Sequence, residues 1–214
     1  PSDKYFYKSY EYFEQGKFQL AVDNLTECIK IDPKLIAAYY NRAKLYHLLG
    51  NLESALVDYS KAIKLNKKDS DGYNNRGNVY ENLGNFDDAI SDYNRSIKLD
   101  PENPNGYYNR GILYAKLENY NDALFDFLKA IEIDPEDPDS YNNLGNVYVA
   151  LGRIEEAIDK FTKCVRIDPD YAGAYNNRGD AYKSLDNFED AIADYTRSIR
   201  IEDNNPYSYL KRAE

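Results

Sequence analysis

The sequence predicts an all-α fold, an α-solenoid built from tandem helical hairpins. Asp-Pro pairs recur at multiples of 34 residues, aromatic and small residues recur in columns at that interval, and each interval holds two runs of helically spaced apolar residues. The intervals are 2–35, 36–69, 70–103, 104–137, 138–171 and 172–205, and 206–214 begins a seventh. We expect one array over 1–214, with the last segment as a partial capping helix.

The interval 70–103 illustrates how each hairpin is expected to form. Its residues at three- and four-residue spacing are Tyr73, Gly77, Tyr80 and Leu83, followed by Phe86, Ala89, Ile90, Tyr93 and Ile97. Gly84-Asn85 between the two runs predicts the end of one helix and the start of the next. Asp100-Pro101 predicts the end of the second helix, because a residue before proline avoids the helical region. Glu118 and Asp186 stand where the other intervals have this turn glycine.

Three columns test the interval on residues that did not define it. The fourth residue is Tyr5, Tyr39, Tyr73, Tyr107, Tyr141, Tyr175 and Tyr209. The twentieth is alanine in all six intervals, and the eighth is always small: Ser9, Ala43, Gly77, Gly111, Gly145, Gly179 and Ala213. Small residues let the two helices of a hairpin approach closely. A single hairpin cannot bury its apolar faces alone, so we expect the hairpins to stack.

These columns resemble the tetratricopeptide repeat (TPR), a 34-residue helix-turn-helix, over all six intervals. The sequence departs from the family in having tyrosine for tryptophan at the fourth position, mostly arginine for leucine at the seventh, and Lys67 and Asp203 in place of the proline. The resemblance implies a right-handed superhelix whose first helices line a concave groove. It also implies a scaffold that binds other proteins, with no catalytic activity.

One column on this expected groove is an asparagine ladder at the sixth position of five consecutive intervals. The ladder resembles that of the TPR superhelix in the protein O-GlcNAc transferases, which hold extended peptides. An amide has donors and an acceptor, and can pair with a peptide backbone of any sequence. The alternative is that these asparagines steady neighbouring repeats. The candidate peptide-binding residues are Asn41, Asn75, Asn109, Asn143, Asn177, Tyr40, Tyr108, Asn74, Asn142, Asn176, Asn78 and Asn146.

Two further columns covary within this one sequence. Wherever the seventh residue of an interval is arginine, the twenty-third is aspartate, whereas the fifth interval has Leu144 and Lys160. We expect ion pairs between the two helices of a hairpin: Arg42–Asp58, Arg76–Asp92, Arg110–Asp126 and Arg178–Asp194. If partly exposed, each would contribute only about 0–1 kcal/mol.

The two cysteines, Cys28 and Cys164, occupy the same small column four intervals apart. Helices pack roughly 8–10 Å apart and a disulfide needs α-carbons within about 7 Å. Two cysteines four hairpins apart are therefore too distant to form a disulfide. We expect both to be small buried residues. Free thiols suggest a reducing compartment, and we expect an intracellular, cytoplasmic location.

The formal net charge of -10 argues against nucleic-acid and anionic membrane partners and favours an extended neutral or basic peptide. His47 has no neighbours at metal-ligand spacing, so we expect neither a metal nor a cofactor. A TPR subclass that clamps chaperone carboxylates matches at Asn41 but not at Phe6, Tyr10, Asp71 or Asn75. The alternatives to a peptide scaffold are self-association through solenoid ends and a substrate-recognition region of a larger protein. Because the chain starts at Pro1 and has no methionine, we expect it to be an excerpt or a processed form.

Overall fold

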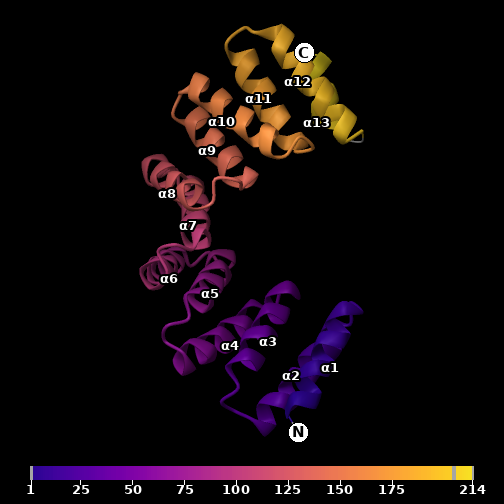
Figure 1. Ribbon diagram of the computed structural model, residues 1–214, viewed down its shortest axis with the longest axis vertical. Helices are drawn as coiled ribbons and strands as arrows, with labels where there is room; N and C mark the ends of the chain where they lie inside the picture. Colours follow the sequence, from indigo (N-terminus) through magenta and orange to yellow (C-terminus); the bar gives the residue numbers. More distant parts are fainter. Residues whose placement is uncertain (1, 204–205, 214) are drawn as a thin grey trace. The chain divides into compact units, whose positions relative to one another are not determined.

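The computed structural model describes residues 2–203 and 206–213, and these residues form thirteen α-helices and no strand. The chain divides into two compact units, 1–102 and 103–214, and each is described by itself (Figure 1). The first holds α1 (Ser2–Glu14), α2 (Phe18–Ile31), α3 (Ile36–Leu48), α4 (Leu52–Leu65), α5 (Ser70–Asn82) and α6 (Phe86–Leu99). The second holds α7 (Pro104–Lys116), α8 (Tyr120–Ile133), α9 (Pro138–Ala150), α10 (Ile154–Ile167), α11 (Ala172–Ser184), α12 (Phe188–Ile201) and α13 (Pro206–Ala213).

The predicted all-α helical-repeat class is confirmed. Each first helix of a hairpin, called helix A below, begins at the first residue of its predicted interval, and each is followed by one helix B. The predicted ends 204–205 and 214, and Pro1, lie outside the described residues. That both units belong to one array over 1–214 stays a prediction. Among the described helices, none is both long enough and apolar enough to cross a bilayer.

The turn between helices A and B has the same geometry with and without glycine. The turn glycine adopts a left-handed conformation, as at Gly84 with a φ of 77°. Glu118 and Asp186 adopt it too, with φ of 60° and 59°. The Glu118 backbone N–H donates to Ala115 O at 3.0 Å and the Asn119 N–H to Tyr114 O at 2.8 Å, which satisfies carbonyls at the helix end. The packing of each hairpin thus holds Glu118 and Asp186 in a left-handed conformation that these residues do not favour.

The small eighth column is required by an aromatic ring on helix B. A Cβ atom on Gly77 would lie 2.7 Å from Cε1 of Tyr93, and one on Gly179 would lie 2.7 Å from Cε1 of Tyr195. Both distances are far below ordinary contact, so these rings lie directly on the helix A backbone. The sequence predicted the close approach of the helices, but it did not identify the ring that causes it.

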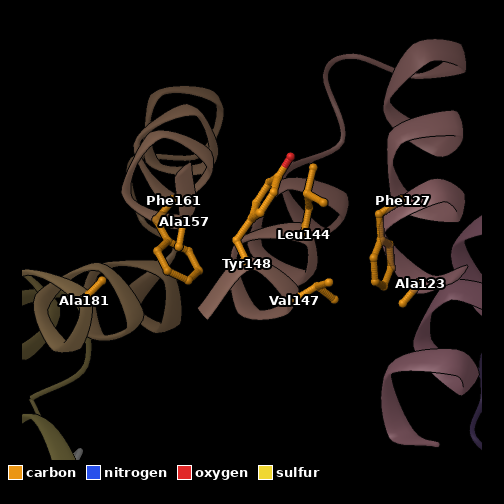
Figure 2. Close-up of a cluster of buried hydrophobic side chains, with 8 residues drawn as sticks. All are labelled: Ala123, Phe127, Leu144, Val147, Tyr148, Ala157, Phe161 and Ala181. Atoms are coloured by element: carbon orange, nitrogen blue, oxygen red, sulfur yellow. The ribbon is translucent and has the colours of Figure 1, made fainter. Parts of the chain in front are cut away.

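Stacking of successive hairpins buries a continuous apolar layer, as Figure 2 shows for the second unit. Phe127 of α8 and Phe161 of α10 are 1% and 0% exposed, with Leu144 and Val147 of α9 beside them. Ala181 of α11 joins the same cluster. One cluster therefore links helices of three consecutive hairpins, as expected of a repeat that cannot bury its faces alone.

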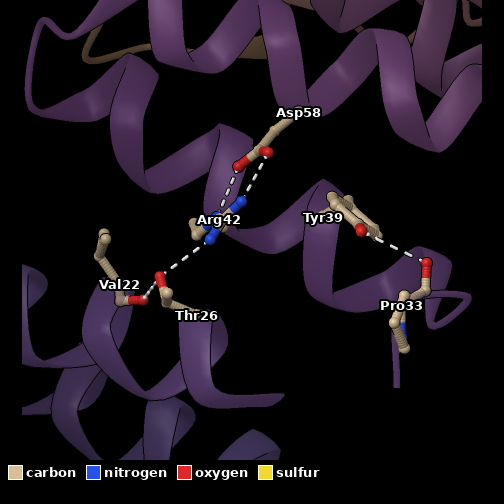
Figure 3. A network of polar contacts seen from close by, with 6 residues as sticks. All are labelled: Val22, Thr26, Pro33, Tyr39, Arg42 and Asp58. Atoms are coloured by element: carbon tan, nitrogen blue, oxygen red, sulfur yellow. Dashed lines mark hydrogen bonds and ion pairs between the residues drawn. The ribbon is translucent and has the colours of Figure 1, made fainter. Parts of the chain in front are cut away.

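The four predicted arginine–aspartate pairs are confirmed, and each is a two-pronged pair. Arg42 Nε and Nη2 donate to the two carboxylate oxygens of Asp58 at 2.7 and 2.8 Å (Figure 3). The pairs Arg76–Asp92, Arg110–Asp126 and Arg178–Asp194 repeat this geometry. The aspartate side chains are only 1–8% exposed. These pairs are therefore buried rather than the partly exposed pairs for which about 0–1 kcal/mol would apply.

Three of these arginines also contact the preceding hairpin, a contact that was not predicted from the sequence. Arg42 Nη1 donates to Thr26 Oγ1 at 2.9 Å, and Thr26 Oγ1 donates to Val22 O (Figure 3). Arg76 and Arg178 likewise donate to Ser60 and Thr162, both residues at the twenty-fifth position. Each of these arginines thus joins one hairpin internally and fastens it to the hairpin before it.

The fifth interval replaces this polar junction with an apolar one. Leu144 stands at the arginine position and is fully buried, and Lys160 at the aspartate position donates instead to its neighbour Asp159. The residue equivalent to Thr26 in the preceding hairpin is Leu128. Three positions therefore change together, which is the signal by which the inter-hairpin contact could have been found from the sequence.

Both cysteines are free and fully buried, as predicted. Burial, together with nearby carboxylates led by Asp139, raises the pKa of Cys164 to about 12. Burial also raises the pKa of Cys28. The thiolate form is therefore disfavoured in the folded chain, and both residues act as small core side chains.

Candidate functional site

The asparagine ladder joins neighbouring A helices inside each unit. In the first unit, Asn41 Nδ2 donates to Tyr10 Oη at 3.0 Å and Asn75 Nδ2 to Tyr40 Oη at 2.5 Å. In the second unit, Asn143 donates to Tyr108 Oη at 3.1 Å and Asn177 to Asn142 Oδ1 at 2.9 Å. Asn109 is half-buried in α7 at the same position of its interval. The bonded ladder asparagines thus steady neighbouring repeats, the alternative that the sequence left open. Each of these amides can offer a peptide its carbonyl oxygen, and Asn41, Asn143 and Asn177 can also offer the second hydrogen of the amide nitrogen.

Among the residues that directly precede the ladder positions, Tyr40, Tyr108 and Asn142 accept hydrogen bonds from the ladder amides. Asn74, Asn142 and Asn176 are buried, with 7%, 9% and 5% of their surface exposed. Tyr40 and Tyr108 are half-buried. Burial, and then Asp71 for Tyr40 and Asp139 for Tyr108, raises both tyrosine pKa values to about 12. The hydroxyls therefore stay neutral and keep accepting the ladder amides.

The remaining two predicted residues, Asn78 and Asn146, differ in their environment. Asn78 is half-buried, and its Oδ1 accepts a hydrogen bond from Tyr93 Oη at 2.7 Å. Asn146 on α9 is exposed. Of the predicted residues, Asn146 is therefore well placed to meet a partner without a change in the fold.

Beside the ladder lies a pocket that recurs with the repeat, here called the A-face socket. Each socket is lined by the ninth, twelfth and twenty-fourth residues of one interval and by the sixth, ninth and tenth of the next. The socket of the first unit has a volume of about 120 Å³ and is lined by Ser9, Tyr10, Phe13, Leu25, Asn41, Lys44 and Leu45. Those of the second unit have volumes of about 290 and 180 Å³. The larger of these two is lined by Ile112, Ala115, Tyr120, Phe127, Asn143, Asn146 and Val147. The smaller is lined by Asn146, Val149, Ile154, Phe161, Asn177, Asp180, Ala181 and Ser184.

The two sockets of the second unit combine apolar walls with amides. Buried Phe127 and Phe161 line one socket each, whereas Val149 is 41% exposed. Asn146 lines both sockets, so they are neighbours along the A helices. The candidate binding residues predicted from the sequence were asparagines and two tyrosines. Apolar Phe13, Ile112 and Val149 were not among them, although these residues share the ninth or twelfth position of their intervals with other socket residues.

Asp180, the carboxylate in the socket that Val149 lines, already has hydrogen-bond partners. Asp180 accepts hydrogen bonds from Tyr195 Oη at 2.8 Å and from Tyr207 Oη, and Lys211 Nζ lies 3.8 Å from its Oδ1. Lys211 stands at the ladder position that follows Asn176. Asn176 Oδ1 is buried without a hydrogen-bond partner. The ladder is therefore broken where lysine replaces asparagine.

His47 lies at the end of α3, half-buried, and its Nε2 is 2.7 Å from the Asn82 amide nitrogen. Burial lowers the His47 pKa, which favours the neutral ring that can accept this hydrogen bond. Across residues 2–203 and 206–213, no group of three or more histidine, cysteine or acidic side chains is arranged to hold a metal ion. The site therefore consists of sockets and amides.

Comparison with protein-family models identifies the repeats. A tetratricopeptide repeat model matches residues 70–103, 104–137 and 172–205, and a TPR repeat model matches 10–50, 43–84 and 145–186. A further tetratricopeptide repeat model matches 127–159. The chain belongs to the tetratricopeptide repeat family. The predicted family is thus confirmed.

Solved structures of other TPR-like proteins share this fold. YrrB, described as a TPR protein with an unusual peptide-binding site, is 26% identical over 89% of this chain and 98% of its own, with a TM-score of 0.70. PilW, a type IV pilus biogenesis factor, is 18% identical over 98% and 97%, with a TM-score of 0.86. PilF of Pseudomonas aeruginosa is 16% identical over 99% and 96%, with a TM-score of 0.83. A comparison with curated proteins finds no match.

Proposed function

We propose that this TPR chain is a non-catalytic scaffold that holds an extended segment of a partner protein. The segment lies on the surface formed by the A helices and their sockets, here called the A-face. The observation that carries the proposal is the A-face socket, which recurs at equivalent positions in both units. A pocket lined by apolar side chains and a few amides suits the side chains and backbone of a bound segment. The peptide-binding site of YrrB supports the same use of the fold.

The ladder contributes to this role in two ways. Its amide nitrogens hold adjacent A helices together, so the surface is preorganised before a partner arrives. Its carbonyl oxygens can accept hydrogen bonds from the backbone N–H groups of the bound segment. The likeness to the ladder of the O-GlcNAc transferases motivates this second role. The net charge of -10 favours a neutral or basic partner segment over an acidic one.

The test begins with the immobilised chain as bait and mass spectrometry of the proteins it retains. The partner segment, once mapped, is titrated calorimetrically against the wild type, Val149→Glu and Phe125→Glu. Val149 lines a socket, and Phe125 on α8 lines none of the described sockets and is 55% exposed, so it is a matched surface control. We expect Val149→Glu to abolish binding and Phe125→Glu to preserve it. The opposite pattern would place the binding surface on the B helices and refute the proposal.

A further inference from the structure

The spacing of the two sockets in the second unit limits what conformation a bound segment can have. Each socket lies between the A helices of consecutive hairpins, and α9 contacts both α7 and α11. Axes of packed helices lie roughly 8–10 Å apart. The two sockets are equivalent positions one hairpin apart, so their centres are separated by roughly this distance.

Few regular peptide conformations place two side chains on one face at that distance. In a β-strand, residues on the same face are about 6.6 Å apart. In a polyproline II helix, with three residues per turn and about 3.1 Å per residue, every third side chain returns to the same face after about 9.3 Å. The latter spacing matches the spacing of the sockets. A polyproline II backbone also has no internal hydrogen bonds, so its polar groups are open to the socket amides.

The charge of this surface indicates the chemistry of the occupant. Helix α9 contains no lysine or arginine, and Asp139 is its one acidic residue. The socket linings include one charged residue, Asp180, which already accepts the Tyr195 hydroxyl. Because Tyr195, Tyr207 and Lys211 already contact this carboxylate, the groove matches an uncharged segment: a charge buried there would lose its hydration without gaining a counterion.

We infer that the A-face of the second unit binds a neutral, proline-containing segment in the polyproline II conformation, with apolar side chains at every third residue. One apolar side chain enters the socket at Ile112 and the next enters the socket at Val149. Asn146, which lines both, is positioned to contact the backbone between them. This inference rests on the proposed function and adds the partner's spacing and conformation.

Synthetic peptides test the spacing directly. Fluorescein-labelled twelve-residue peptides of alanine, proline and leucine, equal in composition, each carry three leucines spaced two, three or four residues apart. Fluorescence anisotropy with the full chain measures their affinities. We expect the three-residue spacing to bind at least about tenfold more tightly, because it alone buries two leucines at once. Equal affinities, or no binding of any peptide, would overturn the inference.

Variants locate the binding. Ile112→Asp and Val149→Asp should each remove most of the affinity for the three-residue peptide, whereas Phe125→Asp should not. Circular dichroism confirms that each variant is folded. Light scattering tests whether a second copy of the chain occupies the sockets instead. A molecular mass that rises with concentration in the wild type but not in Val149→Asp would overturn the inference. If the natural partner depends on Val149 but the peptides show no preferred spacing, the inference fails while the proposed function survives.

Discussion

Removing the acid from one buried ion pair should destabilise the chain strongly. In Asp58→Ala, the Arg42 guanidinium keeps its hydrogen bond to Thr26 but loses both bonds to the carboxylate. The Arg42 and Asp58 side chains are 15% and 3% exposed, so water cannot fully replace the lost partner. Breaking a buried pair in this way costs about 3–5 kcal/mol. For a chain of this length the melting temperature should fall by roughly 6–20 °C.

Two further variants make this prediction specific to the buried pair. Asp159→Ala removes a carboxylate that also pairs with a lysine, but its side chain is 72% exposed, so the effect should stay within about 0.5 kcal/mol. The triple change Thr26→Leu, Arg42→Leu and Asp58→Lys copies the apolar junction of the fifth interval. It should recover most of the stability lost in Asp58→Ala, because the unpaired guanidinium is gone and the long side chain of a lysine can carry its ammonium toward solvent.

Thermal unfolding followed by circular dichroism measures all three. A fall of less than about 2 °C for Asp58→Ala would show that the pair contributes no more than an exposed one, and would refute the reasoning. A triple variant that melts below Asp58→Ala would contradict the view that the fifth interval replaces the junction as a unit.

Further predictions concern the turn between helices A and B, Cys164 and Lys211. Glu118→Gly should stabilise the chain by about 1 kcal/mol because it relieves a left-handed conformation, and Gly84→Ala should destabilise it; unfolding shifts of the opposite sign would contradict the turn geometry. Burial raises the pKa of Cys164 from 9.0 to about 12, so between these pH values the thiol stays protonated in the folded chain but ionises in the unfolded chain. The contribution of this thiol to stability is therefore complete below pH 9 and is lost as the pH rises toward 12. Unfolding measured at pH 8 and at pH 10.5 should show the lower stability at pH 10.5. Alkylation of Cys164 by iodoacetamide at pH 8 should require denaturant, and rapid reaction of the folded chain would refute its burial. Lys211→Asn should supply the missing donor to Asn176 Oδ1 and add about 1 kcal/mol, and a lower melting temperature would argue against a continued ladder.

The features that the sequence predicted well are those that depend on spacing alone. A period of 34 residues places the start of each helix A, and the proline and glycine positions place the helix ends. The ion pairs were predictable because Leu144 and Lys160 change together in one interval, which is evidence for a contact within one hairpin. Glu118 could be recognised as a turn residue only because its interval was already known.

The features that the sequence did not predict depend on how side chains from two hairpins meet. Asn142 and Asn176 belong to a polar column, and only the structure shows that neighbouring helices bury them. The sequence could not show that the ladder amide nitrogens bond to an adjacent helix, as Asn143 and Asn177 do, and peptide binding by the ladder stays a prediction. The sockets arise from six positions on two hairpins, so no single column of the repeat reveals them.

The central claim is that a partner protein is held on the A-face, and a photo-crosslinker tests it most directly. The photoreactive amino acid benzoylphenylalanine replaces Val149 in one protein and Phe125 in another, both at exposed apolar positions. After irradiation with the purified partner, mass spectrometry maps the crosslinked peptides. The account predicts crosslinks from position 149 to one short, extended segment of the partner and none from position 125. Crosslinks from position 125 alone would contradict it.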